Sequence, residues 1–153
     1  MEPYSMSVEH CIKLTEGITM TSKRTDEDYN YICDALYKYN LESVSGLPDV
    51  RTDINFVMKD GDKAIGGIFC NTFNMCMYVD VMWLEAAYRG RGYGRLMISR
   101  AEESAREKGC VFVHTCTFSY QSPEFYKACG YEVFAELRDY PNGIVQYFLK
   151  KKL

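Results

Sequence analysis

Arg89-Gly90-Arg91-Gly92-Tyr93-Gly94 is the stretch that decides the fold, because it joins a predicted strand to a predicted helix. An apolar run over residues 78–84 precedes it, and helical periodicity over residues 95–108 follows it. A strand, a basic glycine-rich turn and a helix present free backbone N–H groups to an anion at the helix N-terminus. Glycine permits positive φ and close approach to a phosphate, and arginine adds charge-assisted contacts. The turn therefore predicts a site for a phosphate-bearing cofactor.

The length and composition of the chain indicate a single globular domain covering residues 1–153, with residues 1–14 as a short N-terminal extension. Hydrophobic residues make up 47% of the sequence, which is enough for a core. The 18 basic and 21 acidic residues give a net charge of −3, which argues against nucleic-acid binding and is compatible with a cationic substrate. Neither a signal peptide nor a membrane-spanning run is expected.

The seven cysteines do not form a pattern typical of a metal site, because no C-x-x-C pair occurs and only two histidines accompany them. Most of them lie in apolar, strand-like runs, where cysteine behaves as a small buried hydrophobe. No metal site is therefore predicted, and a reducing cytoplasmic compartment is expected.

The periodicity of the chain predicts an α/β domain built around one mixed, mostly antiparallel sheet flanked by helices. Strands are expected over residues 17–21, 53–59, 64–71, 75–84, 111–115, 131–137 and 144–149; helices are expected after Thr25, over 95–108 with Met97, Ala101, Ala105 and Leu96 as its apolar residues, and after Ser122. Asp60-Gly61 is a hairpin signal that makes the central strands an antiparallel meander. The strand after the long helix is expected to run parallel to the one before it, because a helical crossover joins them.

Three phosphate-binding arrangements compete for the glycine-rich turn. A Walker-type loop requires Gly-Lys followed by Ser or Thr, which the turn lacks. A dinucleotide-binding fold expects the turn after the first strand, whereas this one lies past the middle of the chain and follows a meander. The third arrangement holds the pyrophosphate of coenzyme A.

The turn and a second segment together resemble one family. Arg89-x-x-Gly92-x-Gly94 resembles the R/Q-x-x-G-x-G/A motif of the GCN5-related N-acetyltransferase (GNAT) family, and Phe125-Tyr126-Lys127-Ala128-Cys129-Gly130-Tyr131 resembles its later FYxxxGF segment. The order and spacing of the two motifs agree with the family, and the likeness covers roughly residues 64–137. The ending around Asp139-Tyr140-Pro141 is similar to that of a small bacterial branch.

The resemblance implies a sheet whose parallel pair splays apart to admit acetyl coenzyme A. It implies that backbone amides of the turn hold the pyrophosphate and that the backbone of Leu84 bonds the cofactor near the thioester. Many members carry an asparagine at the position of Ser119, so this chain departs from the pattern there. The implied cofactor-binding residues are Leu84, Arg89, Gly90, Arg91, Gly92, Tyr93, Gly94, Arg95 and Ser119.

Three residues are candidates for the chemistry. The resemblance places Tyr126 where a tyrosine protonates the departing thiolate, with a core aromatic beside Phe125 as the alternative. Asp80 lies in an otherwise apolar run and, with period two, is expected to share a face with Tyr78, Met82 and Leu84. Asp80 is a candidate base or ammonium contact, with a structural carboxylate as the alternative, and Glu85 is the second candidate base.

The resulting hypothesis is an acetyl-CoA-dependent N-acetyltransferase whose acceptor amine attacks the thioester directly. The expected acceptor is a small-molecule primary amine bound between residues 25–50 and the Asp139–Ile144 loop. A protein lysine or N-terminal amine is the alternative acceptor, and a catalytically inactive module that binds coenzyme A is the alternative class. The family's frequent dimers make a homodimer the expected assembly.

Overall fold

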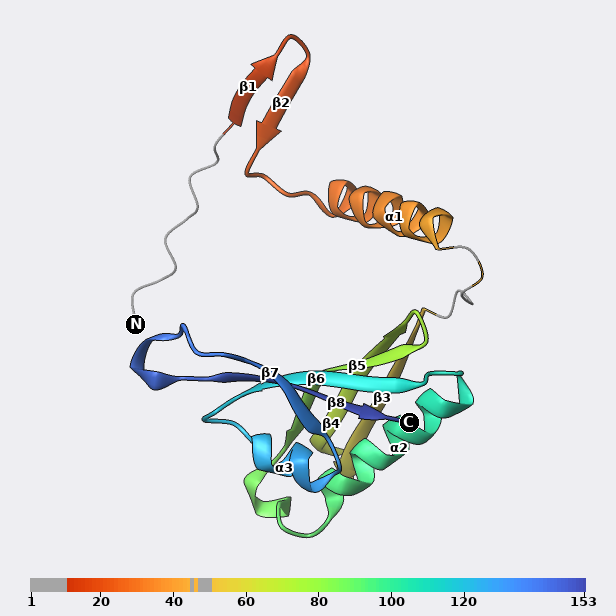
Figure 1. The fold of residues 1–153 in the computed structure, drawn as a ribbon, viewed down its shortest axis with the longest axis vertical. Coiled ribbons are helices and arrows are strands. Elements are labelled where there is room, and N and C mark those ends of the chain that lie inside the picture. Colours follow the sequence, from red (N-terminus) through yellow and green to blue (C-terminus); the bar gives the residue numbers. More distant parts are fainter. Residues whose placement is uncertain (1–10, 45, 47–50) are drawn as a thin grey trace. The chain divides into compact units, whose positions relative to one another are not determined.

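The computed structural model describes residues 11–44, 46 and 51–153. The chain divides into two compact units, Met1–Gly46 and Leu47–Leu153, and each is described by itself (Figure 1). The expectation of one domain over residues 1–153 stays a prediction.

The first unit begins with a hairpin. Strand β1 (Cys11–Thr15) pairs antiparallel with strand β2 (Ile18–Thr21), and Gly17 takes a φ of 82° in the turn between them. Glycine suits this position because it adopts positive φ without a steric penalty. Strand β2 was expected, but β1 falls in the segment expected to be an extension. Residues 1–10 lie outside the described residues.

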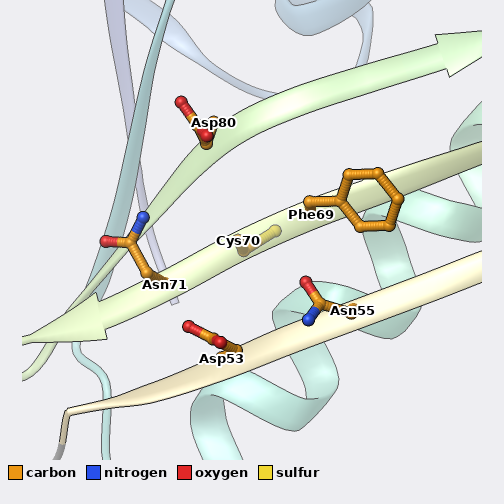
Figure 2. A pocket seen from close by; sticks show the side chains of 6 residues that line it. All are labelled: Asp53, Asn55, Phe69, Cys70, Asn71 and Asp80. Atoms are coloured by element: carbon orange, nitrogen blue, oxygen red, sulfur yellow. The ribbon is translucent and has the colours of Figure 1, made fainter. Parts of the chain in front are cut away.

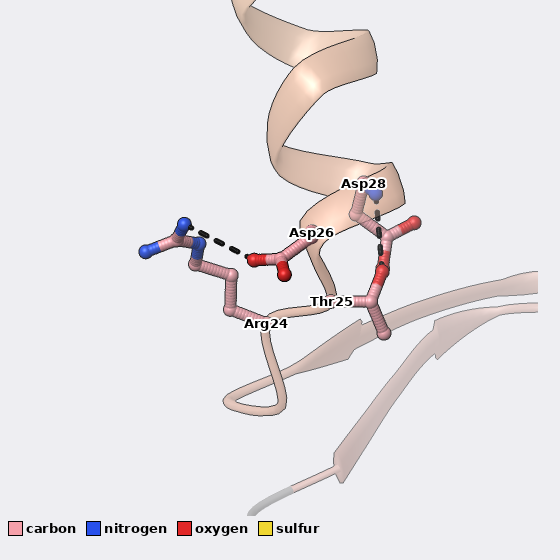
Figure 3. Close-up of polar contacts among 4 residues, drawn as sticks. All are labelled: Arg24, Thr25, Asp26 and Asp28. Carbon is pink, nitrogen blue, oxygen red and sulfur yellow. Dashed lines mark hydrogen bonds and ion pairs between the residues drawn. The ribbon is translucent and has the colours of Figure 1, made fainter.

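Helix α1 (Asp26–Ser43) follows the hairpin and begins at the capping residue that the sequence predicts. The hydroxyl of Thr25 accepts a hydrogen bond of 3.0 Å from the backbone N–H of Asp28 (Figure 3). Arg24 pairs with Asp26 at 3.6 Å. Acidic side chains in the first turn also interact favourably with the positive end of the helix dipole, so local sequence explains where α1 starts.

The second unit contains a mixed sheet with the strand order β3-β4-β5-β6-β8-β7. Its strands are β3 (Thr52–Asp60), β4 (Lys63–Phe73), β5 (Cys76–Leu84), β6 (Phe112–Phe118), β7 (Glu132–Leu137) and β8 (Gln146–Lys152). Neighbouring strands are antiparallel except β5 and β6, which are parallel. The expected fold class, a mostly antiparallel sheet with one parallel pair, is confirmed.

Two helices accompany this sheet: α2 (Tyr93–Glu107) joins β5 to β6, and α3 (Pro123–Ala128) joins β6 to β7. Short 3-10 turns lie at Ala86–Tyr88 and Pro141–Gly143. Helix α2 contacts β3, β4 and β5 and is the crossover that makes β5 and β6 parallel (Figure 1).

The buried side of α2 differs in one position from the sequence expectation. Met97, Ala101 and Ala105 are buried as predicted, but Leu96 is 49% exposed and Ile98 takes its place in the core. Leu96 and Ile98 lie about 100° to either side of Met97 around the helix axis, so the buried apolar stripe includes only one of them.

The core lies between α2 and the sheet. Its fully buried side chains come from four strands and the helix: Ile68, Met77, Val79, Val113, Leu149 and Ile98. Burying side chains of this size contributes about 1.5–3 kcal/mol each relative to exposure. Among the described residues, every helix is too short or too polar to cross a membrane.

Candidate functional site

The parallel pair opens partway along its length. Strands β5 and β6 pair only from Cys76 opposite Phe112 to Val79 opposite Thr115. At this last pair of residues, the hydroxyl of Thr115 donates a hydrogen bond of 3.0 Å to the carbonyl of Val79. Beyond it β5 continues to Leu84 without pairing to β6, so the expected splay is present and its unpaired edge offers backbone N–H groups.

A β-bulge lies in β5 at the start of this opening. Phe69 of β4 is opposite Val81, whereas the next residue, Cys70, is opposite Val79. Asp80 is therefore the extra residue and has no partner on β4. A bulge at this position also changes which side of the strand each later side chain takes.

The bulge makes the expected grouping of Asp80 wrong. Before it, Met77 and Val79 face the core; after it, Met82 and Leu84 pack against the same core. A strict period of two would have placed these two pairs on opposite faces. Asp80 is exposed and does not share a face with Met82 and Leu84.

Asp80 lines a pocket of about 360 Å³ on the exposed side of the sheet (Figure 2). The other lining residues come from β3 and β4, and they are Asp53, Asn55, Phe69, Cys70 and Asn71. Two carboxylates and two amides therefore face one hollow, which suits a cationic, hydrogen-bonding molecule. Sequence reasoning missed the residues of β3 and β4; the alternation of polar residues along β3 was the available signal.

The thiol in this pocket is not set up as a nucleophile. Burial, together with the nearby Asp80 carboxylate, raises the pKa of Cys70 to about 12. A thiol with that pKa stays protonated at neutral pH, and the thiolate is the reactive form. Cys70 is therefore not placed to act as a nucleophile.

Glu85 is engaged away from the pocket. Its carboxylate pairs with Lys63 at 2.8 Å, and its backbone N–H donates to the carbonyl of Ile65 at 2.8 Å. The hydrogen bond and charge of Glu85 raise the pKa of Lys63. Glu85 therefore joins the β3–β4 hairpin to the end of β5.

The glycine-rich turn combines positive φ with open space. Gly90 and Gly92 have φ values of 73° and 85°, and a Cβ at either position would meet nothing within 4 Å. Gly92 precedes the first residue of α2, Tyr93, and no side chain caps the helix. The start of α2 is thus uncapped and the space beside both glycines is open, which fits a bound phosphate oxygen.

The arginines of the turn have different surroundings. The Nε of Arg89 donates to the carbonyl of Leu84 at 2.9 Å, so this side chain fastens the turn to the end of β5. The guanidinium of Arg91 lies 5.8 Å from the ring centre of Tyr88. Arg95, on the first turn of α2, is exposed.

Gly94 brings the two sequence motifs into contact. A Cβ on Gly94 would lie 3.1 Å from the ring of Phe125 on α3 and 3.6 Å from Cε of Met82. The first of these distances is tighter than ordinary packing, so only glycine lets α2 approach α3 this closely. The glycine-rich turn and the Phe125-Tyr126 segment are therefore in contact.

Tyr126 is nearly buried, with 8% of its surface exposed, and lies near the point where the parallel strands part. Burial raises the pKa of Tyr126, and the nearby hydroxyl of Thr115, the last paired residue of β6, opposes this rise. The ring centres of Phe125 and Tyr131 lie 5.3 Å and 5.5 Å from that of Tyr126. A phenol held this way remains protonated at neutral pH.

Ser119 connects two loops. Its backbone N–H donates to the carbonyl of Val145 at 2.7 Å, and its hydroxyl accepts from the N–H of Val145 at 3.1 Å. Tyr140 packs edge-on against Phe118 in the same region, with ring centres 5.3 Å apart. The Asp139–Ile144 loop is therefore joined to the carboxyl end of β6.

Tyr78 is a residue near the opening that sequence reasoning did not single out. Its hydroxyl lies 3.6 Å from the sulfur of Cys116, and this contact, together with burial, raises the pKa of Tyr78 to about 12. The ring of His114 lies 4.9 Å from that of Tyr78, and burial lowers the pKa of His114. Both groups are thus neutral at pH 7.

Comparison with known proteins identifies the family. The sequence matches the Acetyltransferase (GNAT) family over residues 19–131, and the chain belongs to that family. It is 39% identical over 89 residues to blasticidin-S acetyltransferase of Streptomyces morookaense. That match covers 58% of this chain and 65% of the Streptomyces enzyme, slightly less than two thirds of that enzyme's length.

Solved structures share the fold. An acetyltransferase from Bacillus cereus superposes with a TM-score of 0.77 at 29% identity, covering 86% of this chain and 96% of that protein. A protein described as a streptothricin acetyltransferase from Bacillus anthracis was crystallised with acetyl coenzyme A. It superposes with a TM-score of 0.60 at 17% identity. The latter match covers 73% of this chain and 67% of that protein. Family membership and such complexes support acetyl coenzyme A as the cosubstrate.

Proposed function

We propose that this protein transfers an acetyl group from acetyl coenzyme A to a primary amine of a small cationic molecule. The observation that carries the proposal is the parting of β5 and β6 beyond Val79 and Thr115. This opening begins beside Asp80 on β5 and Thr115 on β6, which interacts with Tyr126, and β5 continues from it towards the glycine-rich turn. It provides one place where an acyl donor and an amine could meet.

The turn is the proposed pyrophosphate site. The backbone N–H groups from Gly90 to Arg95 would hold the pyrophosphate, with Arg91 and Arg95 adding positive charge at the rim, while Arg89 fastens the turn to β5. Ser119 belongs to this proposed cofactor-binding set through its carbonyl oxygen and its hydroxyl proton, because its N–H and its hydroxyl oxygen already bond Val145. Bound acetyl coenzyme A would supply the acetyl thioester. The backbone from the bulge to Leu84 would donate hydrogen bonds to the acetyl oxygen.

The proposed chemistry needs two proton transfers. Asp80 contacts the ammonium group and accepts its proton, directly or through water, so that the neutral amine attacks the acetyl carbon. As the new C–N bond forms and the C–S bond breaks, Tyr126 donates its phenolic proton to the departing sulfur. Glu85, the other candidate base, is a weaker one because Lys63 neutralises it.

The character of the pocket supports a small cationic acceptor. Asp53 and Asp80 supply negative charge, and Asn55 and Asn71 supply hydrogen-bonding groups. The name of the Streptomyces relative, blasticidin-S acetyltransferase, also supports a small molecule as the acceptor. A protein lysine or N-terminal amine is the alternative acceptor.

An acetyl-transfer screen tests the proposal. The full chain is incubated with acetyl coenzyme A and blasticidin S, a streptothricin, spermidine, an aminoglycoside or a lysine-containing peptide, and products are detected by mass. We expect a mass gain of one acetyl group on one or more of the small amines. Transfer to the peptide alone would favour the alternative acceptor. Tight coenzyme A binding without transfer to any amine would contradict the enzymatic proposal and indicate a binding module.

A further inference from the structure

A carboxylate is buried on α2, away from the turn and the pocket. Glu102 is 4% exposed, and its Oε2 accepts a hydrogen bond of 2.7 Å from Nζ of Lys151 on β8. A guanidinium nitrogen of Arg106 lies 3.8 Å from the same oxygen. Carboxylates are rarely buried to this extent unless they are paired, and breaking such a pair is costly. Glu102 therefore ties the middle of α2 to the end of the sheet.

Tyr131, the residue just before β7, is associated with this carboxylate. Among the described residues, the Tyr131 hydroxyl and Oε1 of Glu102 are the buried side-chain oxygen or nitrogen atoms that lack a hydrogen-bond partner of good geometry. Burial raises the pKa of Tyr131, and the charge of Glu102 raises it further, so the two groups lie within electrostatic reach. Each is the natural partner of the other.

Tyr131 also contacts Tyr126 in two ways. Its ring meets that of Tyr126 edge to face, with centres 5.5 Å apart and planes at 69°. Its backbone N–H donates to the carbonyl of Tyr126 at 3.0 Å. The ammonium of Lys151 lies 5.5 Å from the centre of the Tyr131 ring. The chain of contacts Lys151, Glu102, Tyr131 and Tyr126 thus runs from the sheet to the proposed proton donor.

We propose that Tyr131, held by Glu102 and Lys151, is a positioning residue that sets the orientation of the Tyr126 phenol. The proposal rests on the proposed role of Tyr126 as proton donor. Helix α2 carries the pyrophosphate turn at its start and Glu102 about three turns later, which is about 15 Å along the helix. The contacts of Lys151, Glu102 and Tyr131, called the brace here, therefore fix Tyr126 relative to α2. This is the same helix that would hold the cofactor. Displacing a reacting group by about 1 Å can cost about 100-fold in rate.

A double-mutant cycle tests this brace. Tyr131→Leu removes the ring, Glu102→Gln keeps the shape but removes the charge, and Tyr131→Phe keeps the ring but removes the hydroxyl that interacts with Glu102. Each is made with Tyr126 present and in the Tyr126→Phe background, and turnover of acetyl coenzyme A is measured with spermidine and blasticidin S. With Tyr126 present, we expect Tyr131→Leu to lower kcat about 10- to 100-fold. The KM for acetyl coenzyme A should not change. Tyr131→Phe, which gives up the contact with Glu102, should lose about as much activity as Glu102→Gln.

In the Tyr126→Phe background, the same substitutions should cause no further loss, because no donor remains to be oriented. Equal losses in both backgrounds would overturn the brace while leaving the donor role of Tyr126 intact. A wild-type kcat for Tyr126→Phe alone would instead refute the donor role. If circular dichroism shows that Tyr131→Leu is unfolded, Glu102→Gln carries the comparison, with an expected loss of about tenfold.

A second measurement requires no acceptor. The thiol of bound coenzyme A is titrated by the ultraviolet absorbance of the thiolate, in the wild type and in each variant. A fixed phenol that donates to the thiolate should make the bound thiol ionise at lower pH in the wild type than in Tyr131→Leu. Identical titrations, with coenzyme A bound by both proteins, would overturn the brace.

Discussion

The protonation state of Tyr126 decides whether this residue can act as a donor. Its pKa is raised by burial, so the phenol keeps its proton beyond the ordinary tyrosine value of about 10. Replacement by phenylalanine removes the donor and leaves the ring contacts with Phe125 and Tyr131. We expect Tyr126→Phe to lower kcat about 100-fold with little change in the affinity for acetyl coenzyme A. Steady-state kinetics and calorimetry check this, with the exposed Tyr120→Phe as a control.

The pH dependence of kcat provides a separate test of the same residue. Loss of the phenolic proton at high pH would remove the donor, so activity should fall only above about pH 10. The direction follows from the raised pKa of Tyr126. In Tyr126→Phe this alkaline decrease should disappear from the remaining activity. A decrease at the same pH in both proteins would assign it to another group.

Asp80 should act on the acceptor rather than on the cofactor. Asp80→Asn keeps the size of the side chain and removes the charge that faces the pocket. We expect kcat/KM for the amine to fall about 10- to 100-fold, while the dissociation constant for coenzyme A stays the same. Asp62→Asn, in the exposed β3–β4 turn, is the control and should behave like the wild type. Equal losses in the two variants would remove Asp80 from the site.

Sequence reasoning on Asp80 was partly successful. A carboxylate in an apolar strand was recognised as unusual, but its face was wrong because the bulge at this residue interrupts the alternation. A bulge depends on how β5 aligns with β4, and the alignment is set by contacts between distant residues. Local pattern alone does not contain that information.

At the scale of elements, the start of α2 is the part that the pyrophosphate proposal depends on. Gly92→Glu would place bulk and negative charge in the open space before the helix. We expect the dissociation constant for acetyl coenzyme A to rise about 100-fold or more, measured by calorimetry. The end of the same helix offers a matched control.

Gly109 has a φ of 80°, and a Cβ there also meets nothing within 4 Å. Gly109→Glu therefore introduces the same charge and a similar backbone strain, about 1 kcal/mol or more, far from the turn. It should bind acetyl coenzyme A like the wild type. Unchanged affinity in Gly92→Glu, or equal weakening in both variants, would refute the assigned pyrophosphate site.

Most elements of the sheet and the helices could be predicted from local sequence. Thr25 begins α1, Pro123 lies at the first position of α3, and alternation indicates β3 and β6. The hairpin partner β1 was missed because Cys11–Thr15 has a weak alternating pattern and every residue in it is exposed. Strands without a buried face leave a weak sequence signal.

At the scale of the whole molecule, stability depends on a core shared by distant strands. Leu149 on β8 is fully buried, and its neighbours in register are Thr115 on β6 and Val133 on β7. We expect Leu149→Ala to lower the free energy of unfolding by about 2–5 kcal/mol, because it leaves a cavity. This is a large part of the usual total of about 5–15 kcal/mol. Denaturant unfolding followed by circular dichroism measures it.

Val111→Ala is the control for this substitution, since Val111 is 53% exposed. Surface substitutions usually change stability by less than about 0.5 kcal/mol. A small effect at Leu149 would show that the second unit is not held together by this core.

The sequence by itself determined the family, the cofactor class and the order of elements from β2 onward. These depend on local patterns and motifs, such as a glycine-rich turn at a helix start and Phe125-Tyr126 before Gly130. Tertiary structure alone decided which residues meet. It brought Asp53 and Asn71 to Asp80 through strand register, and Tyr131 to Glu102 through the core that Tyr131 shares with α2. The physical reason is that such contacts follow from long-range pairing and close packing, which a local pattern of residues does not encode.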